Sequence, residues 1–216
     1  MLSVNDPELG AHIHQVLKAG MIETPLNGKE DFCPECIRGA MLKVLDSLRL
    51  DYKDQSLQRT PERVAKMYTE EIFYGLDYSK FPNCTTISND MQYDELLSTR
   101  CSIISMCEHH FVPFQGTALI GYLPKNRILG LSKFNRVVDF FSRRPQIQER
   151  LTAQIHMALA YILDTDDVAV VLQCEHLCVK MRGIQDHQSL TTTSKLSGRF
   201  FSVPPLRAEF LALSRT

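Results

Sequence analysis

Two short segments that combine cysteine with histidine constrain this chain most. One is CEHH at 107–110, and the other is QCEHLC at 173–178. A Cys and a His three residues apart can face one ion from a turn or a first helical turn. If 173–178 is a strand, Cys174, His176 and Cys178 share one face, because side chains alternate with a period of two. The fold is therefore expected to bring two distant segments together.

A thiolate beside imidazoles is a ligand set that suits zinc. For any one of these residues alone, a small buried thiol or a satisfied core histidine is the more common explanation. Two clusters that each contain both residue types favour a metal site. Three protein ligands would leave one coordination position open for water, which is typical of catalytic zinc, whereas four would close a structural site.

The N-terminal part is predicted to be helical. Helices are expected from Pro34 and from Thr60-Pro61, since proline is well suited to a first helical turn. The stretch 20–31 is expected to be a loop. Arg63 and Lys66 are neighbours on one face of the second helix, and by themselves they are explained as a solvated face.

From Cys84 onward the pattern is mixed. Segments rich in β-branched and aliphatic residues predict strands near 98–106, 114–123 and 168–180. Helices are predicted to begin at Ser132 and Pro145, and a last one to cover Pro205 to Leu213. The pattern indicates an α+β chain, with an N-terminal helical region over 1–83 and a core over 84–216.

The stretch GLSKFNR at 130–136 is a candidate anion site. It places Ser132 at a helix start, with Lys133 and Arg136 in the first turn. Free N–H groups and the helix dipole favour an anion there, and a bound phosphate would offset the two cations that oppose the dipole. The alternative is an ordinary capped surface helix. Arg182 follows Cys178 on the same expected strand face and would add a charge near the metal.

Composition narrows the class of protein. The 216 residues include 24 Lys or Arg and 25 Asp or Glu, a net charge of -1. This balance argues against a general nucleic-acid binder, and a hydrophobic fraction of 44% argues against a disordered chain. No apolar run approaches the roughly 20 residues of a membrane-spanning helix, and the N-terminus lacks the features of a secretory signal. We expect neither a nucleic-acid partner nor a membrane.

Cysteine usage predicts a cytoplasmic protein. The seven cysteines are an odd number, and no export signal is evident, which together indicate a reducing compartment. Cys33 and Cys36 are interpreted as two cysteines in a helix-start turn, with a redox pair or half a zinc site as the alternatives. No strand precedes them, which disfavours a thioredoxin-like role. Cys174 is either a bystander or an oxidative partner for Cys178.

Five stretches of the chain resemble the GTP cyclohydrolase I family. They occur in the family's order from about residue 40 to the C-terminus, which makes the likeness specific. The stretches are TPERVAKMY at 60–68, CEHHF at 107–111, GLSKFNR at 130–136, RPQIQERLT at 144–152 and HLCVKMRG at 176–183.

The resemblance implies a fold and an activity. The family converts GTP and water to 7,8-dihydroneopterin triphosphate and formate, the entry step to folate-type pterins. Its tunnelling fold is an antiparallel sheet with helices on one face, preceded by N-terminal helices. Subunits form a decamer of two face-to-face pentamers, and the active sites lie between subunits.

It also implies roles for particular residues. Zn2+ would be held by Cys107, His110 and Cys178, with His109 and His176 as acid–base groups and Ser132 also catalytic. Glu149 would bind guanine with help from Gln148, and the triphosphate would meet Ser132, Lys133, Arg136 and Arg182, with Arg63 and Lys66 from a neighbouring subunit.

Two other functions remain open. One is a related tunnelling-fold enzyme that processes purines or pterins by a different reaction, because one fold hosts many chemistries. The other is a non-catalytic, zinc-bound GTP-binding protein, which would retain GTP without releasing formate and unfold on chelation. The presence of both histidines together with all three ligands favours the cyclohydrolase.

Overall fold

The computed structural model describes residues 4–29 and 31–214, so the expected loop and both expected domain ranges include residues outside the described part. Contacts divide the chain into two compact units. Residues 25–74 form the smaller unit, and the described residues up to Thr24 group with those from Gly75 onward in the larger one. The division into 1–83 and 84–216 stays a prediction.

The smaller unit contains the two expected helices. They are α2 (Pro34–Ser47) and α3 (Thr60–Lys66), and α3 continues into the π-helical segment η1 (Met67–Ile72). Leu45 of α2 and Ala65 of α3 are buried between them. Thr60 is the first helical residue rather than the cap, and the capping position belongs to Arg59, whose side chain makes no capping hydrogen bond.

Cys33 and Cys36 are joined by a disulfide at the start of α2. Cys33 is the N-cap, as expected of a helix-start turn, and its sulfur accepts a hydrogen bond from the Cys36 N–H at 3.2 Å. This disulfide is compatible with both the helix-start turn and the redox pair that the sequence left open. The other cysteines are free: Cys84, Cys101, Cys107, Cys174 and Cys178.

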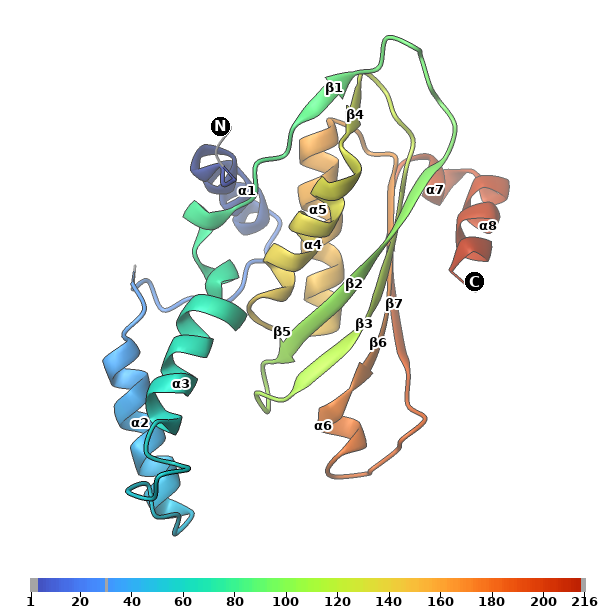
Figure 1. Ribbon diagram of the computed structural model, residues 1–216. Coiled ribbons are helices and arrows are strands. Elements are labelled where there is room, and N and C mark those ends of the chain that lie inside the picture. The colour runs from blue at the N-terminus through green and yellow to red at the C-terminus, as the bar shows by residue number, and fades with distance from the viewer. Residues whose placement is uncertain (1–3, 30, 215–216) are drawn as a thin grey trace. The chain divides into compact units, whose positions relative to one another are not determined.

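The larger unit is built on a five-stranded sheet (Figure 1). Its strand order is β5-β2-β3-β6-β7, and all pairings are antiparallel except the short parallel contact of β5 with β2. A separate pair is formed by β1 (Thr86–Ser88) and β4 (Arg127–Leu129). The strands of the main sheet are β2 (Leu97–Cys107), β3 (Pro113–Tyr122), β5 (Pro145–Gln146), β6 (Val168–His176) and β7 (Thr191–Leu196).

The strands expected near 98–106 and 114–123 are confirmed, and two expectations further along are wrong. The third strand ends at His176, because residues 177–180 form the short helix α6 (Leu177–Lys180). The helix expected from Pro145 begins at Gln148 instead, because Pro145 and Gln146 pair with Met106 and Cys107. Proline lacks an N–H and is tolerated on such an edge strand.

Two long helices cover one face of the sheet. Figure 1 shows α4 (Leu131–Ser142) and α5 (Gln148–Leu163) side by side against it. Their apolar stripes are fully buried, for example at Phe134 and Val137 of α4 and at Leu151 and Ile155 of α5. This burial removes most of the helices' apolar area from water and is the main source of stability at this face.

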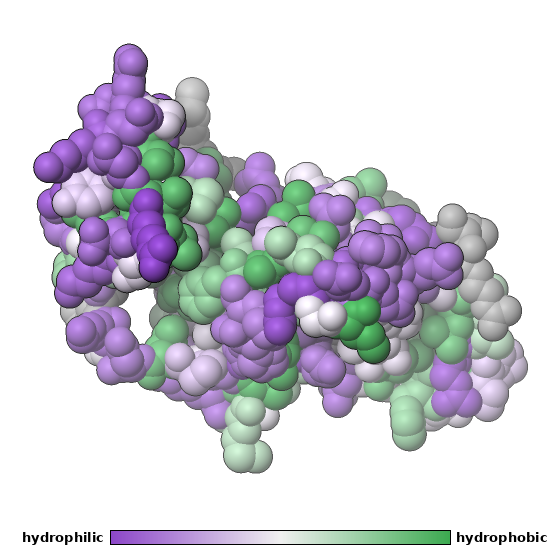
Figure 2. Space-filling view, turned by 90° about the horizontal axis from the view of Figure 1, so that it is seen from below, coloured by the Kyte–Doolittle hydropathy of each residue, from purple (hydrophilic) through white to green (hydrophobic). Residues whose placement is uncertain are grey.

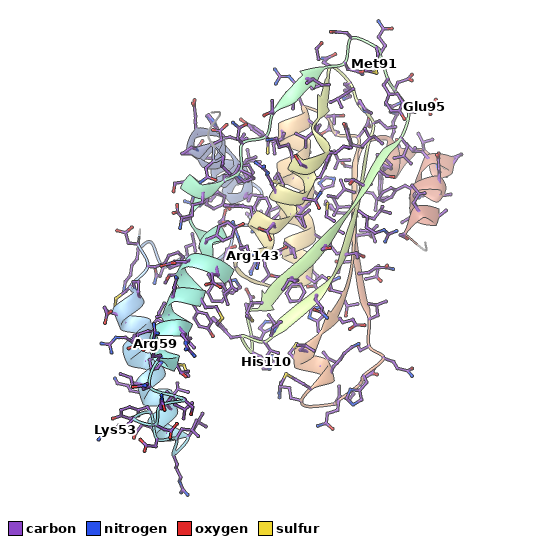
Figure 3. The ribbon with its side chains drawn as sticks, viewed as in Figure 1. Lys53, Arg59, Met91, Glu95, His110 and Arg143 are labelled. Carbon is purple, nitrogen blue, oxygen red and sulfur yellow. A yellow bond between two sulfur atoms is a disulfide. The ribbon has the colours of Figure 1, made fainter. Side chains whose placement is uncertain are left out.

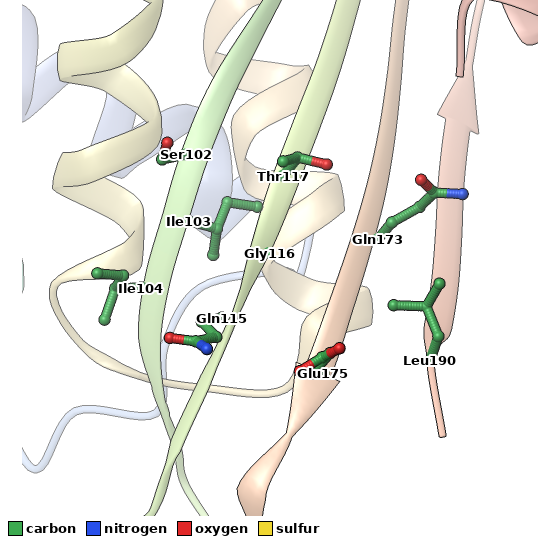
Figure 4. A pocket seen from close by; sticks show the side chains of 9 residues that line it. All are labelled: Ser102, Ile103, Ile104, Gln115, Gly116, Thr117, Gln173, Glu175 and Leu190. Carbon is green, nitrogen blue, oxygen red and sulfur yellow. The ribbon is translucent and has the colours of Figure 1, made fainter. Parts of the chain in front are cut away.

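The opposite face is covered at one end and open at the other. The short helix α7 (Arg199–Ser202) and the expected C-terminal helix α8 (Pro204–Leu213) pack Phe200 and Phe210 onto Leu119 and Val171. Beyond them lies a shallow groove on the bare strands (Figure 4). Its lining residues are Ser102, Ile103, Ile104, Gln115, Gly116, Thr117, Gln173, Glu175 and Leu190.

A buried arginine joins the N-terminal segment to the sheet. Helix α1 (Pro7–Ala19) leads into residues 20–24, and Arg144, which is fully buried, lies 3.6 Å from the carboxylate of Glu23. Its guanidinium also donates to the Tyr78 hydroxyl at 3.1 Å, in the 3-10 turn η3 (Tyr78–Lys80), and to the carbonyl of Gly75 in the turn η2 (Tyr74–Leu76). Losing one partner of such a buried pair costs roughly 3–5 kcal/mol.

No helix among the described residues combines the length and the apolar character that crossing a membrane requires.

Acid should destabilise the larger unit through His156 on α5. Its Nε2 lies 2.8 Å from Ser197 Oγ and 3.2 Å from the Val168 carbonyl, and burial lowers its pKa from 6.5 to about 4. The unfolded chain therefore binds one more proton than the native one between these values. We expect stability to be intact above pH 6.5 and to fall as the pH drops toward 4, by up to about 3 kcal/mol from this residue.

Urea unfolding from pH 7 to pH 4 measures this loss. His156→Gln keeps a donor but cannot titrate, so its free energy of unfolding should fall less steeply with acid than that of the wild type. His12→Gln, at an exposed position of α1, is the matched control and should keep the wild-type slope. Equal slopes for the wild type and His156→Gln would contradict the assignment.

Candidate active site

The two Cys/His segments meet because β2 and β6 share β3 as a neighbour. Both strands are antiparallel to β3, so they run in the same direction and end at the same end of the sheet. Cys107 is the last residue of β2, and His176 is the last of β6. The turn after β2, which carries His110, therefore lies beside α6 (Figure 3).

Cys107, His110 and Cys178 form a group that can bind a metal ion. Their ligand atoms all lie within 4.8 Å of one another, and the Cys107 Sγ is 4.0 Å from the His110 Nδ1. Ligands of tetrahedral zinc are separated by roughly 3.3–3.8 Å, so the group needs to close by only about 1 Å. Burial, together with the neighbouring Cys107, raises the pKa of the Cys178 thiol, and a cation would reverse this. The donor set therefore fits a thiophilic ion.

Cys178 reaches this group from a helix rather than a strand. The expectation that it shares a strand face with Cys174 and His176 is wrong, because α6 begins at Leu177, and the Leu177 carbonyl accepts the Met181 N–H at 2.9 Å. Cys174 is fully buried under the helices, and burial raises its pKa to about 12. It lies outside the metal group. Its role as a bystander or as an oxidative partner for Cys178 stays a prediction.

Arg182 lies next to the metal group, as expected, although it follows a helix and not a strand. Its Nη1 donates to the His110 Nε2 at 2.7 Å. An arginine is always charged and has no acceptor, so this imidazole nitrogen is the acceptor in the hydrogen bond. A positive charge therefore lies at the edge of the group.

His176 is held in one orientation by Gln148. The His176 Nε2 donates to the Gln148 Oε1 at 2.8 Å, and the ring stacks on Phe114 with centroids 4.6 Å apart. The Gln148 amide nitrogen has acceptors on three sides, at Thr191 O, Thr193 Oγ1 and Leu172 O, so its oxygen is the end that faces the histidine. Burial lowers the pKa of His176, and Glu149 partly opposes this. The imidazole is thus neutral near pH 7.

His109 and Glu149 lie exposed at the same end of the sheet. The His109 Nδ1 is 3.9 Å from the Cys107 sulfur, and its Nε2 is 4.0 Å from a carboxylate oxygen of Glu108. Glu149 occupies the first turn of α5, close enough to His176 to affect its pKa. The end of the sheet therefore presents two imidazoles and a free carboxylate around the metal group.

Among the candidate phosphate residues of the larger unit, Arg182 lies at this end, whereas Ser132, Lys133 and Arg136 are not brought to it within one chain. Ser132, Lys133 and Arg136 lie at the start of α4, whereas the end of α4 leads into β5 beside Cys107. The 12 residues of α4 span about 18 Å, so its start lies a full helix length away, next to β4 (Figure 1). Gly130, not Ser132, is the N-cap. Arg63 and Lys66 are exposed on α3 of the smaller unit.

Some residues that contribute to this end of the sheet were not predicted from the sequence. Strand β7 is a run of threonines, TTTSKL, with no apolar alternation, yet Thr191 and Thr193 supply acceptors for Gln148. The β-branched threonines were the available signal for a strand. Nothing in the sequence showed that the Gln148 amide would be used inside the protein.

Comparison with known proteins shows which family the chain resembles. The family model for GTP cyclohydrolase I matches residues 37–215. The GTP cyclohydrolase 1 of Aeromonas salmonicida is 49% identical over 205 residues, which cover 92% of this chain and 93% of the relative. That of Klebsiella pneumoniae subsp. pneumoniae is 47% identical over 209 residues, covering 94% of each.

A solved structure shows a partial likeness. The apo form of the archaeosine synthase QueF-Like is 16% identical, with a TM-score of 0.40 over 48% of this chain and 93% of that one. Sequence identity near one half over more than nine tenths of the chain is the stronger finding. By that measure, this chain belongs to the GTP cyclohydrolase I family.

Proposed function

We propose that this protein converts GTP and water to 7,8-dihydroneopterin triphosphate and formate. The observation that carries the proposal is the grouping of Cys107, His110 and Cys178 with His109 and His176 at one end of the sheet. Membership of the family and relatives that carry the name GTP cyclohydrolase 1 support it. The free thiols suit a reducing compartment, so a cytoplasmic location is part of the proposal.

The metal in this proposal is zinc. Two sulfurs and one imidazole are ligands that zinc prefers, and three protein ligands leave a position for solvent. Zinc, when bound, supplies a Lewis acid that makes water acidic enough to attack at neutral pH. The protein's part is to keep both thiols deprotonated and the ligands in place. The charge of Arg182, beside His110, helps to hold the thiolate form.

His109 and His176 move protons in the proposed reaction. Opening the imidazole ring of guanine adds water at C8, and the ring nitrogens must be protonated as the C8–N bonds break. Imidazoles suit this because their pKa lies near neutrality. His176 donates one N–H to Gln148, which fixes its tautomer and leaves its Nδ1 for proton transfer. Later steps of the reaction rest on the family alone.

Glu149 selects guanine in this proposal. A carboxylate can accept two N–H donors from the guanine edge, a pair that adenine lacks. Glu149 is exposed and its oxygens are available at the first turn of α5. Gln148 was expected to help directly, but its side chain is buried and bonded to His176 and β7. We therefore propose that Gln148 supports the guanine site by holding His176.

The triphosphate needs several cations, and Arg182 is the candidate phosphate residue of the larger unit that lies beside the metal group. We propose that Ser132, Lys133 and Arg136 act in the site of an adjoining subunit, together with Arg63 and Lys66 of a neighbour. A helix N-terminus with two cations remains a good phosphate site when it is supplied from another chain. The active site would then lie between subunits of a homodecamer.

The free edges of the sheet support such an assembly. In the described part of the chain, β7 has a strand on one side alone, and the far side of β2 is paired only at Met106 and Cys107. Unpaired edges of one sheet can pair head to tail and close a ring. Apolar side chains are also exposed near this end, including Phe111, Met181 and Leu190, and Figure 2 shows hydrophobic residues among hydrophilic ones in the view from below.

Incubation with GTP tests the function. The zinc-loaded protein should release one formate for each new pterin chromophore, and a chelator should stop both. Formate is measured enzymatically and the pterin by its absorbance. Tight retention of GTP without formate would instead indicate a binding protein, and consumption of a different purine or pterin would indicate a related enzyme.

Cys178→Ser should abolish metal binding. We expect about one zinc per chain in the wild type and almost none in the variant, with turnover lost in parallel, because a hydroxyl is a far poorer zinc ligand than a thiolate. Cys84→Ser removes a free thiol outside the metal group and is the matched control. Full zinc content in Cys178→Ser, measured by elemental analysis, would remove Cys178 from the ligand set.

Mixed oligomers test the shared site. Lys133→Ala and Cys107→Ala should each be inactive, but subunits unfolded and reassembled together at equal ratio should recover up to about a quarter of wild-type activity, because neighbours supply the intact halves. Cys107→Ala mixed with Cys178→Ala is the control and should recover none, since both defects lie in the same half. Absence of recovery in hetero-oligomers verified by mass would contradict a site between subunits.

A further inference from the structure

One residue within the metal loop (residues 107–110) is tied to a neighbouring helix. Glu108 lies between the ligands Cys107 and His110, and its backbone N–H donates to the Gln146 carbonyl at 3.0 Å. Its carboxylate forms an ion pair with Arg150, whose side chain is only 11% exposed, against 25% for that of Glu108. An ion pair at this depth is screened much less than a surface pair.

Arg150 contacts three acceptors at once. Besides the Glu108 carboxylate, its Nη2 donates to the Pro145 carbonyl at 3.2 Å, and its Nε donates to the Gln146 Oε1 at 3.0 Å. The planar guanidinium can serve such a fork, whereas an ammonium cannot hold the same geometry. Arg150 thus joins the metal loop to strand β5, which itself pairs with Cys107.

The acceptor for Arg150 is held in place by a second amide. The Gln146 amide nitrogen donates to Phe141 O at 2.9 Å and to Gln154 Oε1 at 2.8 Å, so the Gln146 oxygen must face Arg150. Gln154 in turn donates to Ile22 O at 2.8 Å. Both glutamines are almost completely buried. The position of the guanidinium is therefore fixed before any metal binds.

We propose that Arg150 is a positioning residue for the metal centre, acting through Glu108. It holds the metal loop in the conformation that brings Cys107 and His110 together. It also offsets the charge of Glu108, which follows Cys107 in the metal loop. The second Glu108 oxygen lies 4.0 Å from His109 Nε2, so the position of this carboxylate also affects the surroundings of that histidine. This inference rests on the proposed zinc site but not on the reaction.

Arg150→Met tests the proposal without reference to turnover. The zinc dissociation constant, measured by competition with a chromophoric chelator, should rise about 10- to 100-fold, the usual effect of losing a residue that orients metal ligands. At saturating zinc, the fold-decrease in kcat for GTP should be larger than the fold-change in KM. Arg143→Met is the matched control, because it removes another arginine of the same segment, one paired with Asp139 at 2.8 Å. Its zinc affinity should equal that of the wild type.

Two further variants keep the test open if Arg150→Met folds poorly. Arg150→Lys should restore zinc affinity only in part, and adding Glu108→Gln to Arg150→Met should recover some of the loss, since the uncompensated carboxylate is then gone. Unchanged zinc affinity in Arg150→Met and Arg150→Lys, or an equal loss in Arg143→Met, would overturn the proposal. A loss of zinc affinity in a protein that releases no formate would uphold it while the proposed reaction fails.

Discussion

The pairing of β3 with both β2 and β6 is the constraint on which the site depends. Because β2 and β6 share one antiparallel neighbour, they run in the same direction and end together, at Cys107 and at His176. The pairing also sets which side chains face the helices. A slip of one residue would turn Cys107 and His176 to the opposite face, away from α5. The metal group therefore depends on a register that is specified by the buried apolar residues of all three strands.

At this end of the sheet, polar side chains from the first turn of α5 contact both the buried and the charged residues of the site. Three successive residues of its first turn have different tasks in the structure and in our proposals. Gln148 is buried and orients His176, Glu149 stays exposed, and Arg150 pairs with Glu108. An α-helix advances about 100° per residue, so consecutive side chains point in different directions from one short turn. The start of α4, in contrast, presents its cations a helix length away from the metal group, which is why we propose that the site is completed by a neighbour.

Much of this could be predicted from the sequence, for reasons that are local. The apolar spacing of α4, the prolines at the starts of α2 and α3, and the β-branched runs of β2 and β3 all describe single elements. The pairing of CEHH with a distant Cys predicted the metal group. Predictions failed where the same residues were compatible with both a strand and a helix. Residues 173–178 alternate as a strand would, yet a helix begins at Leu177, and RPQIQER looks like a helix start, yet Pro145 and Gln146 pair with β2.

By itself, the sequence determined most of the helices and strands, which residue types can hold a metal, and the family to which the chain belongs. These follow from composition, periodicity and short stretches of neighbouring residues, all of which are independent of distant contacts. Only the tertiary structure decided that Gln148 is used inside the protein, that Arg150 reaches the metal loop, and that the start of α4 lies a helix length from the thiols. These are distances between residues far apart in the chain, and they are set by strand register and helix packing rather than by any local preference.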